Sequence, residues 1–144
     1  MAEYIQGAQR VLGEVEKAVV GKQDVLEKIM TAILAGGHIL IEDIPGTGKT
    51  TMALAFSRAM GLDAKRVQFT PDVLPSDLTG FTIYQKETGK FAYQPGAVMC
   101  NLLLADEINR TSPKTQSALL EVMEEQQVTV DGVTYPLARP FMVL

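Results

Sequence analysis

The residues with the clearest chemical potential are Gly46-Thr47-Gly48-Lys49-Thr50, which stand between an apolar segment and an amphipathic one. In a glycine-rich turn, successive backbone N–H groups can bind phosphate oxygens, and a following helix adds the positive end of its dipole. Lys49 could reach the β- and γ-phosphates of a nucleotide, and the Thr50 hydroxyl could ligate Mg²⁺. The candidate nucleotide-binding residues here are Pro45, Gly46, Thr47, Gly48, Lys49, Thr50 and Thr51.

This segment departs from the phosphate-binding pattern G-x-x-x-x-G-K-[ST] at one position, where Asp43 replaces the first glycine. Aspartate tolerates turn and left-handed backbone conformations, so the loop can keep its shape. Its carboxylate must then point away from the phosphates, because a negative charge there would oppose anion binding. The alternative is a glycine-rich turn that only caps a helix. The location after a predicted strand and before a predicted helix favours phosphate binding.

Two acidic residues, Asp106 and Glu107, follow the apolar run 102–105 and lie 57 residues after Lys49. A buried parallel strand that ends here would place both carboxylates at the edge of the sheet where open α/β folds bind ligands. Asp106 would hold Mg²⁺ together with Thr50, through water, because Mg²⁺ keeps several of its waters. Glu107 would orient or deprotonate the water that attacks the γ-phosphate, which makes Glu107 and Lys49 the candidate catalytic residues.

Weaker candidates lie outside these two segments. Val19, Val20 and Gly21 precede the second predicted helix and could contact adenine through their backbone groups, although an ordinary helix terminus is the alternative. Gln68 or Thr70, at the end of a predicted strand, could hydrogen-bond Glu107 as a switch. His38 is expected in the turn that enters a strand rather than at a catalytic centre, and an acidic pair at a strand end also occurs without function.

The elements that must position these residues follow from hydrophobic periodicity. Apolar residues at helical spacing predict helices over 5–19, 25–34 and 49–60, and a further helix begins at Ser112-Pro113. Apolar or alternating runs predict strands over 38–41, 66–70, 102–105 and 141–144. Alternating segments around short turns predict hairpins over 81–93 and 128–135, the second with an Asp-Gly turn. This order predicts a three-layer α/β fold, a parallel sheet flanked by helices, with two inserted β-hairpins.

Composition excludes several classes of protein. The 144 residues are 47% hydrophobic and 21% charged, as expected for one ordered domain. The single cysteine, Cys100, excludes an internal disulfide and a cysteine-based zinc site. Thirteen basic against 17 acidic residues give a net charge of −4, so no general field attracts nucleic acid or anionic lipid. Without a signal peptide or a run long enough to span a membrane, the expected location is the cytoplasm.

Taken together, these residues resemble the AAA+ ATPases and, within them, the MoxR family. The resemblance spans nearly the whole chain and lies in residues 19–22, 42–50, 68–77 and 104–110. It implies Mg²⁺-dependent hydrolysis of ATP to ADP and phosphate in a self-associated ring, expected to be a hexamer. It also implies chaperone-like remodelling of client proteins, with von Willebrand factor A domain proteins as partners.

The same resemblance implies that residues 1–144 are an incomplete AAA+ domain. In the family, sensor 1, an arginine finger and a helical lid follow the strand that begins near Phe141, and they would lie beyond Leu144. The isolated chain is therefore expected to hydrolyse ATP poorly. Two alternatives remain: a nucleotide-binding scaffold without turnover, and a nucleic-acid motor, against which the acidic charge balance argues.

Overall fold

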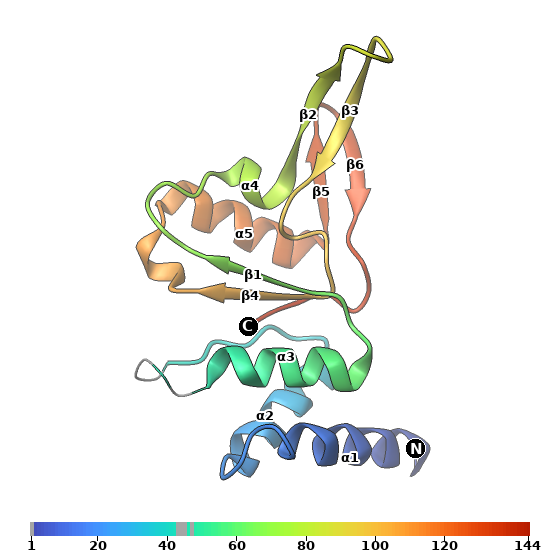
Figure 1. The fold of residues 1–144 in the computed structure, drawn as a ribbon, viewed down its shortest axis with the longest axis vertical. Helices are drawn as coiled ribbons and strands as arrows, with labels where there is room; N and C mark the ends of the chain where they lie inside the picture. Colours follow the sequence, from blue (N-terminus) through green and yellow to red (C-terminus); the bar gives the residue numbers. More distant parts are fainter. Residues whose placement is uncertain (1, 43–45, 47) are drawn as a thin grey trace.

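The three layers of the predicted fold are present in the computed structural model, which describes residues 2–42, 46 and 48–144. Asp43, Pro45 and Thr47, three residues of the predicted phosphate loop, lie outside the described part. A parallel sheet lies between helices on both of its faces (Figure 1). Its strands are β1 (Ala64–Gln68), β4 (Leu102–Asp106) and β7 (Met142–Val143), in the order β1-β4-β7.

Side chains from the two faces of the sheet enter two separate cores. Leu102 and Leu104 of β4 pack with α1 (Ala2–Glu16), α2 (Gln23–Leu34) and α3 (Lys49–Met60). Leu103, between them, packs on the opposite face with α4 (Pro75–Thr79) and α5 (Pro113–Glu125). This alternation is what a strand buried on both faces requires. It confirms the parallel α/β class predicted from the run 102–105.

The predicted strand over 38–41 is wrong as a strand, although its segment lies beside β7. Its backbone contributes one ladder-type bond, from the Ile39 nitrogen to the Val143 oxygen at 2.9 Å. The next bond is made by a side chain, because the Val143 nitrogen donates to Nδ1 of His38 at 3.0 Å. The imidazole therefore replaces a backbone carbonyl in the ladder. His38 also contacts the Met123 oxygen through Nε2 at 3.3 Å, so the ring has a structural role in linking this segment to other parts of the chain.

Both predicted hairpins are confirmed, and they lie side by side above the sheet (Figure 1). The first is β2 (Gly80–Gln85) with β3 (Lys90–Pro95), and the second is β5 (Gln127–Val130) with β6 (Val133–Pro136). Asp131 and Gly132 form the second turn with φ of 50° and 78°, the backbone that favours an Asp-Gly pair. Tyr93 stacks on Tyr135 with ring centroids 3.9 Å apart, which joins the hairpins.

Two helices that follow β1, α4 and α5, cover the face of the sheet opposite α1, α2 and α3. The side chain of Ser112 caps α5 by accepting a hydrogen bond from the Thr115 nitrogen at 3.2 Å, as the Ser-Pro start predicted. The helix α4 lies between β1 and the first hairpin, where no element was predicted, and Asp77 accepts a bond from the Leu74 nitrogen at 2.8 Å. Cys100 is buried in this layer, and burial raises the pKa of its thiol to about 11.

Candidate nucleotide-binding site

A cavity of about 960 Å³ lies where α3 begins and where β1 and β4 end. Its position follows from the parallel sheet, because the register pairs Gln68 with Asp106 and so brings both strand ends to one edge. Open α/β sheets bind ligands at this edge. The candidate site residues that line the cavity are Gly46, Gly48, Lys49, Thr50, Asp106 and Glu107.

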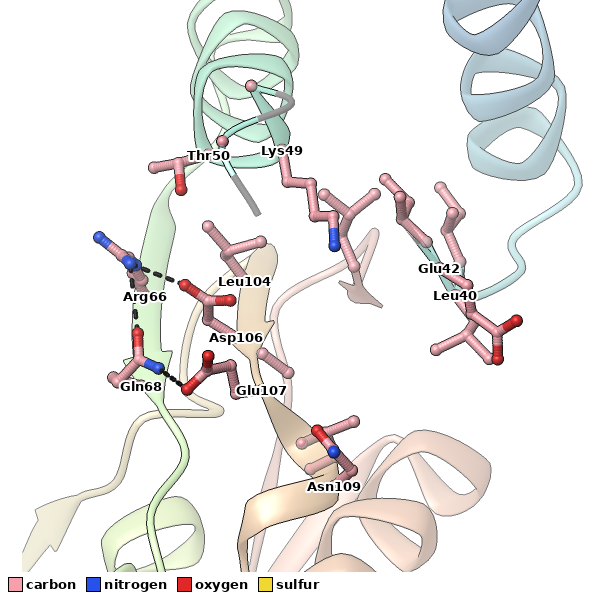
Figure 2. Close-up of a pocket in the computed structure, with 17 residues that line it drawn as sticks. Leu40, Glu42, Lys49, Thr50, Arg66, Gln68, Leu104, Asp106, Glu107 and Asn109 are labelled. Atoms are coloured by element: carbon pink, nitrogen blue, oxygen red, sulfur yellow. Dashed lines mark hydrogen bonds and ion pairs between the residues drawn. The ribbon is translucent and has the colours of Figure 1, made fainter. Parts of the chain in front are cut away.

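The start of α3 gives one wall of the cavity. Gly48 precedes the helix with φ of 84°, a left-handed backbone that glycine adopts without the strain of a side chain. Lys49 and Thr50 occupy the first turn, and their side chains project toward the strand ends (Figure 2). The first N–H groups of an α-helix do not bond to an earlier turn of the same helix, and with the helix dipole they suit an anion. This wall can therefore bind phosphate oxygens.

The end of β4 gives the opposite wall. Asp106 is the last residue of the strand, and Glu107 follows with φ of 56°. A left-handed backbone at a non-glycine residue costs about 1 kcal/mol, and such outliers gather at functional sites. The short η1 helix (Ile108–Arg110) begins directly afterwards. The backbone turns sharply at Glu107, and the successive carboxylates of Asp106 and Glu107 both line the cavity.

Three side chains contact these carboxylates, two from β1 and one from η1, and Figure 2 shows the two from β1. Arg66 donates from Nη2 to Asp106 Oδ2 at 2.7 Å and to Gln68 Oε1 at 3.3 Å. Gln68 donates from Nε2 to Glu107 Oε2 at 2.7 Å. Arg110 approaches the same oxygen through Nε at 3.1 Å. Because the arginine side chains are more than half exposed, each pair adds about 1 kcal/mol at most to folding stability.

Of the two residues predicted to hydrogen-bond Glu107 as a switch, one makes that bond, and the switching itself stays a prediction. Gln68, rather than Thr70, contacts Glu107. Sequence reasoning missed Arg66, Arg110 and Asn109, although Arg66 and Asn109 line the cavity. A signal for Arg66 was available, because residues two apart on a strand share a face and Arg66 therefore lies on the same side as Gln68.

The oxygen atoms at the cavity fit a magnesium ion that is shared with a nucleotide. The Thr50 hydroxyl and the Asp106 carboxylate line the same space, and Mg²⁺ prefers such oxygen ligands. Within the described residues, no group of three or more histidine, cysteine or acidic side chains could hold a metal ion. Mg²⁺ usually binds through one or two protein oxygens, substrate phosphates and water. The residues present suit that arrangement and would not make a site for a metal alone.

Among the predicted contacts that the structure describes, four do not line this cavity. Val19, Val20 and Gly21 border a second hollow of about 680 Å³ between α1 and α2. Val19 is buried, while Val20 has an exposed fraction of 87%. Thr51 is exposed on α3 and does not line either hollow. The adenine contact at 19–21 and the contact at Thr51 remain predictions.

Comparison with known proteins identifies the family. The model of the ATPase family associated with various cellular activities (AAA) matches residues 38–144. Chaperone MoxR1 of Mycobacterium tuberculosis is 41% identical over 144 residues, which are 100% of this chain and 38% of that protein. The uncharacterized protein YeaC of Bacillus subtilis is 56% identical over 135 residues, 94% of this chain and 42% of that protein.

A solved structure agrees with these sequence relatives. A crystal structure from Cytophaga hutchinsonii, assigned as an ATPase, superposes with a TM-score of 0.88 at 47% identity and covers 99% of this chain and 43% of its own. The chain thus spans about two-fifths of the length of its relatives. None of the helices in the described ranges is both long and apolar enough to cross a membrane. The match over residues 38–144 and the identity across the whole chain show that this is a MoxR-type member of the AAA ATPase family.

Proposed function

We propose that the protein binds ATP with Mg²⁺ in the cavity between α3 and β4 and hydrolyses it to ADP and phosphate. The observation that carries this proposal is that one cavity is lined by Lys49, Thr50, Asp106 and Glu107. These residues come from two segments that are distant in the sequence. A positive helix start with a lysine attracts phosphate, and the facing carboxylates suit metal binding and water activation. The ATPase family of the chain supports the same reading.

Each residue has a distinct role in this proposal. Backbone N–H groups after Gly48 and the ammonium of Lys49 would bind the β- and γ-phosphates. Thr50 and Asp106 would hold Mg²⁺, which when bound neutralises charge on the phosphates. Glu107 would take a proton from water as the water oxygen bonds to the γ-phosphorus. The bond from that phosphorus to the bridging oxygen then breaks, and ADP leaves with the electron pair.

The contacts of Glu107 indicate which of its oxygens would face the water. Gln68 and Arg110 both contact Oε2, at 2.7 Å and 3.1 Å. We therefore assign the proton-accepting role to Oε1. The two contacts on Oε2 hold the side chain in one orientation, as a base that must approach a single water requires.

Larger assemblies and clients belong to the whole protein. The name of the mycobacterial relative, Chaperone MoxR1, supports a chaperone-like role in which ATP hydrolysis remodels partner proteins. From the family resemblance we propose a ring, expected to be a hexamer, cytoplasmic, with von Willebrand factor A domain proteins among its partners. We also propose that sensor 1, an arginine finger and a helical lid in the whole protein complete the site.

Phosphate release by the intact protein tests this function. We expect release from ATP in the presence of Mg²⁺ and none when EDTA removes the metal, because Thr50 and Asp106 would act on the phosphates through the metal. ATP binding without phosphate release in the Mg²⁺ sample would favour the alternative, a nucleotide-binding scaffold without turnover. The absence of ATP binding with and without Mg²⁺ would contradict the proposal as a whole.

A further inference from the structure

A chain of hydrogen bonds that begins at one nitrogen of Arg66 joins Asp106 and Glu107, two of the acidic residues that line the cavity. Nη2 of Arg66 lies 2.7 Å from Oδ2 of Asp106 and 3.3 Å from Oε1 of Gln68. Gln68 then donates to Glu107 at 2.7 Å. The path from the proposed metal ligand to the proposed base therefore passes through two side chains of β1.

The sheet explains why these groups meet. Arg66 and Gln68 are two residues apart on β1, so their side chains share a face. The parallel register pairs Arg66 with Leu104 and Gln68 with Asp106, which brings both side chains beside the end of β4. The spacing of these groups is therefore set by the backbone pairing of β1 with β4. The connection does not depend on a loop.

Charge fixes the orientation of the Gln68 amide. Its oxygen faces the guanidinium of Arg66, and its NH₂ group faces the carboxylate of Glu107. The reversed amide would set donor against donor at Arg66 and acceptor against acceptor at Glu107. Arg66 thus favours the one orientation in which Gln68 can donate to Glu107.

Arg66 also determines how Asp106 presents its carboxylate. Arg66 contacts one carboxylate oxygen, and Figure 2 shows the other oxygen directed away from Arg66. Two effects on a metal ion then oppose each other. The positive charge of Arg66 repels Mg²⁺, but the side chain is 52% exposed, and a screened pair changes affinity by about fivefold at most. Hydrogen-bond partners that orient a metal ligand commonly change metal affinity or activity by about 10- to 100-fold.

We propose that Arg66 is a positioning residue that orients Asp106 for Mg²⁺ and, through Gln68, orients Glu107 for water. The proposal rests on the function proposed above. It assigns to a single guanidinium the coupling between metal binding and water activation. The orientation of Asp106 by Arg66 outweighs the repulsion between Arg66 and Mg²⁺. Loss of Arg66 therefore reduces the gain in ATP affinity that Mg²⁺ provides.

The first experiment measures ATP affinity by calorimetry with Mg²⁺ and with EDTA, and takes the ratio of the two affinities. In Arg66→Met we expect this ratio to fall about tenfold relative to wild type. Arg66→Gln, which keeps a polar group, provides a second variant. Arg58→Met is the matched control, because it removes the same charge from the exposed end of α3, outside the cavity. Its ratio is expected to stay within twofold of wild type.

The second experiment tests the path through Gln68. Phosphate release is measured for Arg66→Met, Gln68→Met and the double variant of the intact protein. If Arg66 acts on Glu107 through Gln68, the Gln68 substitution lowers the rate less in the Arg66→Met background than in wild type. A purely structural role of either residue would give additive effects on the rate.

Four results would overturn the proposal. An unchanged ratio in both Arg66 variants removes the orienting role, and a raised ratio identifies Arg66 as a competitor of Mg²⁺. Additive effects of the two substitutions remove the path to Glu107. A wild-type protein that binds no ATP in either buffer overturns the proposed function as well, whereas normal wild-type binding with unaffected variants overturns this inference alone.

Discussion

Substitution of Lys49 by alanine is expected to weaken ATP binding by about 100-fold. The ammonium at the first turn of α3 would make charge-assisted hydrogen bonds to the phosphates, and the loss of such bonds costs about 3 kcal/mol. Alanine is a good helix former, so α3 keeps its start. Calorimetric titration of ATP into wild type and Lys49→Ala measures the change directly.

Lys28→Ala is the matched control for this substitution. Lys28 lies on the exposed side of α2 and does not line the cavity, so its loss removes a similar charge elsewhere. We expect ATP affinity within twofold of wild type for this variant. Equal affinities for wild type and Lys49→Ala, with both proteins folded by circular dichroism, would show that the phosphates bind elsewhere.

Substitution of Glu107 by glutamine is expected to lower the rate of ATP hydrolysis by about 100- to 10,000-fold and to leave ATP affinity within about threefold. A positioned general base contributes an acceleration of this size, and an amide cannot take the proton. Glutamine has nearly the same shape as glutamate. Both residues find the backbone conformation at φ of 56° equally unfavourable, so the substitution adds no backbone strain. Phosphate release and ATP titration on the intact protein separate the two effects.

The control removes a carboxylate far from the cavity. Glu121 is exposed on α5, and Glu121→Gln is expected to hydrolyse ATP at the wild-type rate. A Glu107→Gln variant with near wild-type turnover would mean that another group activates the water. A variant that loses binding and turnover together would instead assign Glu107 to nucleotide binding.

Much of the fold follows from local patterns in the sequence. The apolar run at 102–105 predicts a strand buried on both faces, and Leu102 and Leu103 do enter opposite cores. The Asp131-Gly132 turn and the Ser112 cap have short-range signatures, and both features form. These elements are predictable because the residues that determine them are neighbours in the chain.

The differences arise where a polar side chain, rather than the hydrophobic pattern, decides the local structure. The segment 38–41 is apolar like a strand, but the His38 ring takes the bond of a backbone carbonyl to Val143, 105 residues away. The helix α4 depends on Asp77 accepting a bond from the Leu74 nitrogen within a region rich in proline. Neither arrangement can be read from hydrophobic periodicity.

In the candidate site, too, some residues follow from local motifs and others depend on how the strands pair. The phosphate and acidic segments stand out as motifs, so Lys49, Thr50, Asp106 and Glu107 were predictable. Arg66 belongs to no motif, and its importance depends on the register between β1 and β4. Strand alternation alone relates it to Gln68, but pairing between strands brings it to Asp106.

The most direct test of the account is a structure of the chain with Mg²⁺ and a non-hydrolysable ATP analogue. We expect the γ-phosphate beside Lys49, with the metal about 2.1 Å from the Thr50 hydroxyl and on the side of Asp106 away from Arg66. A triphosphate bound away from the start of α3, or a metal that approaches neither Thr50 nor Asp106, would contradict it.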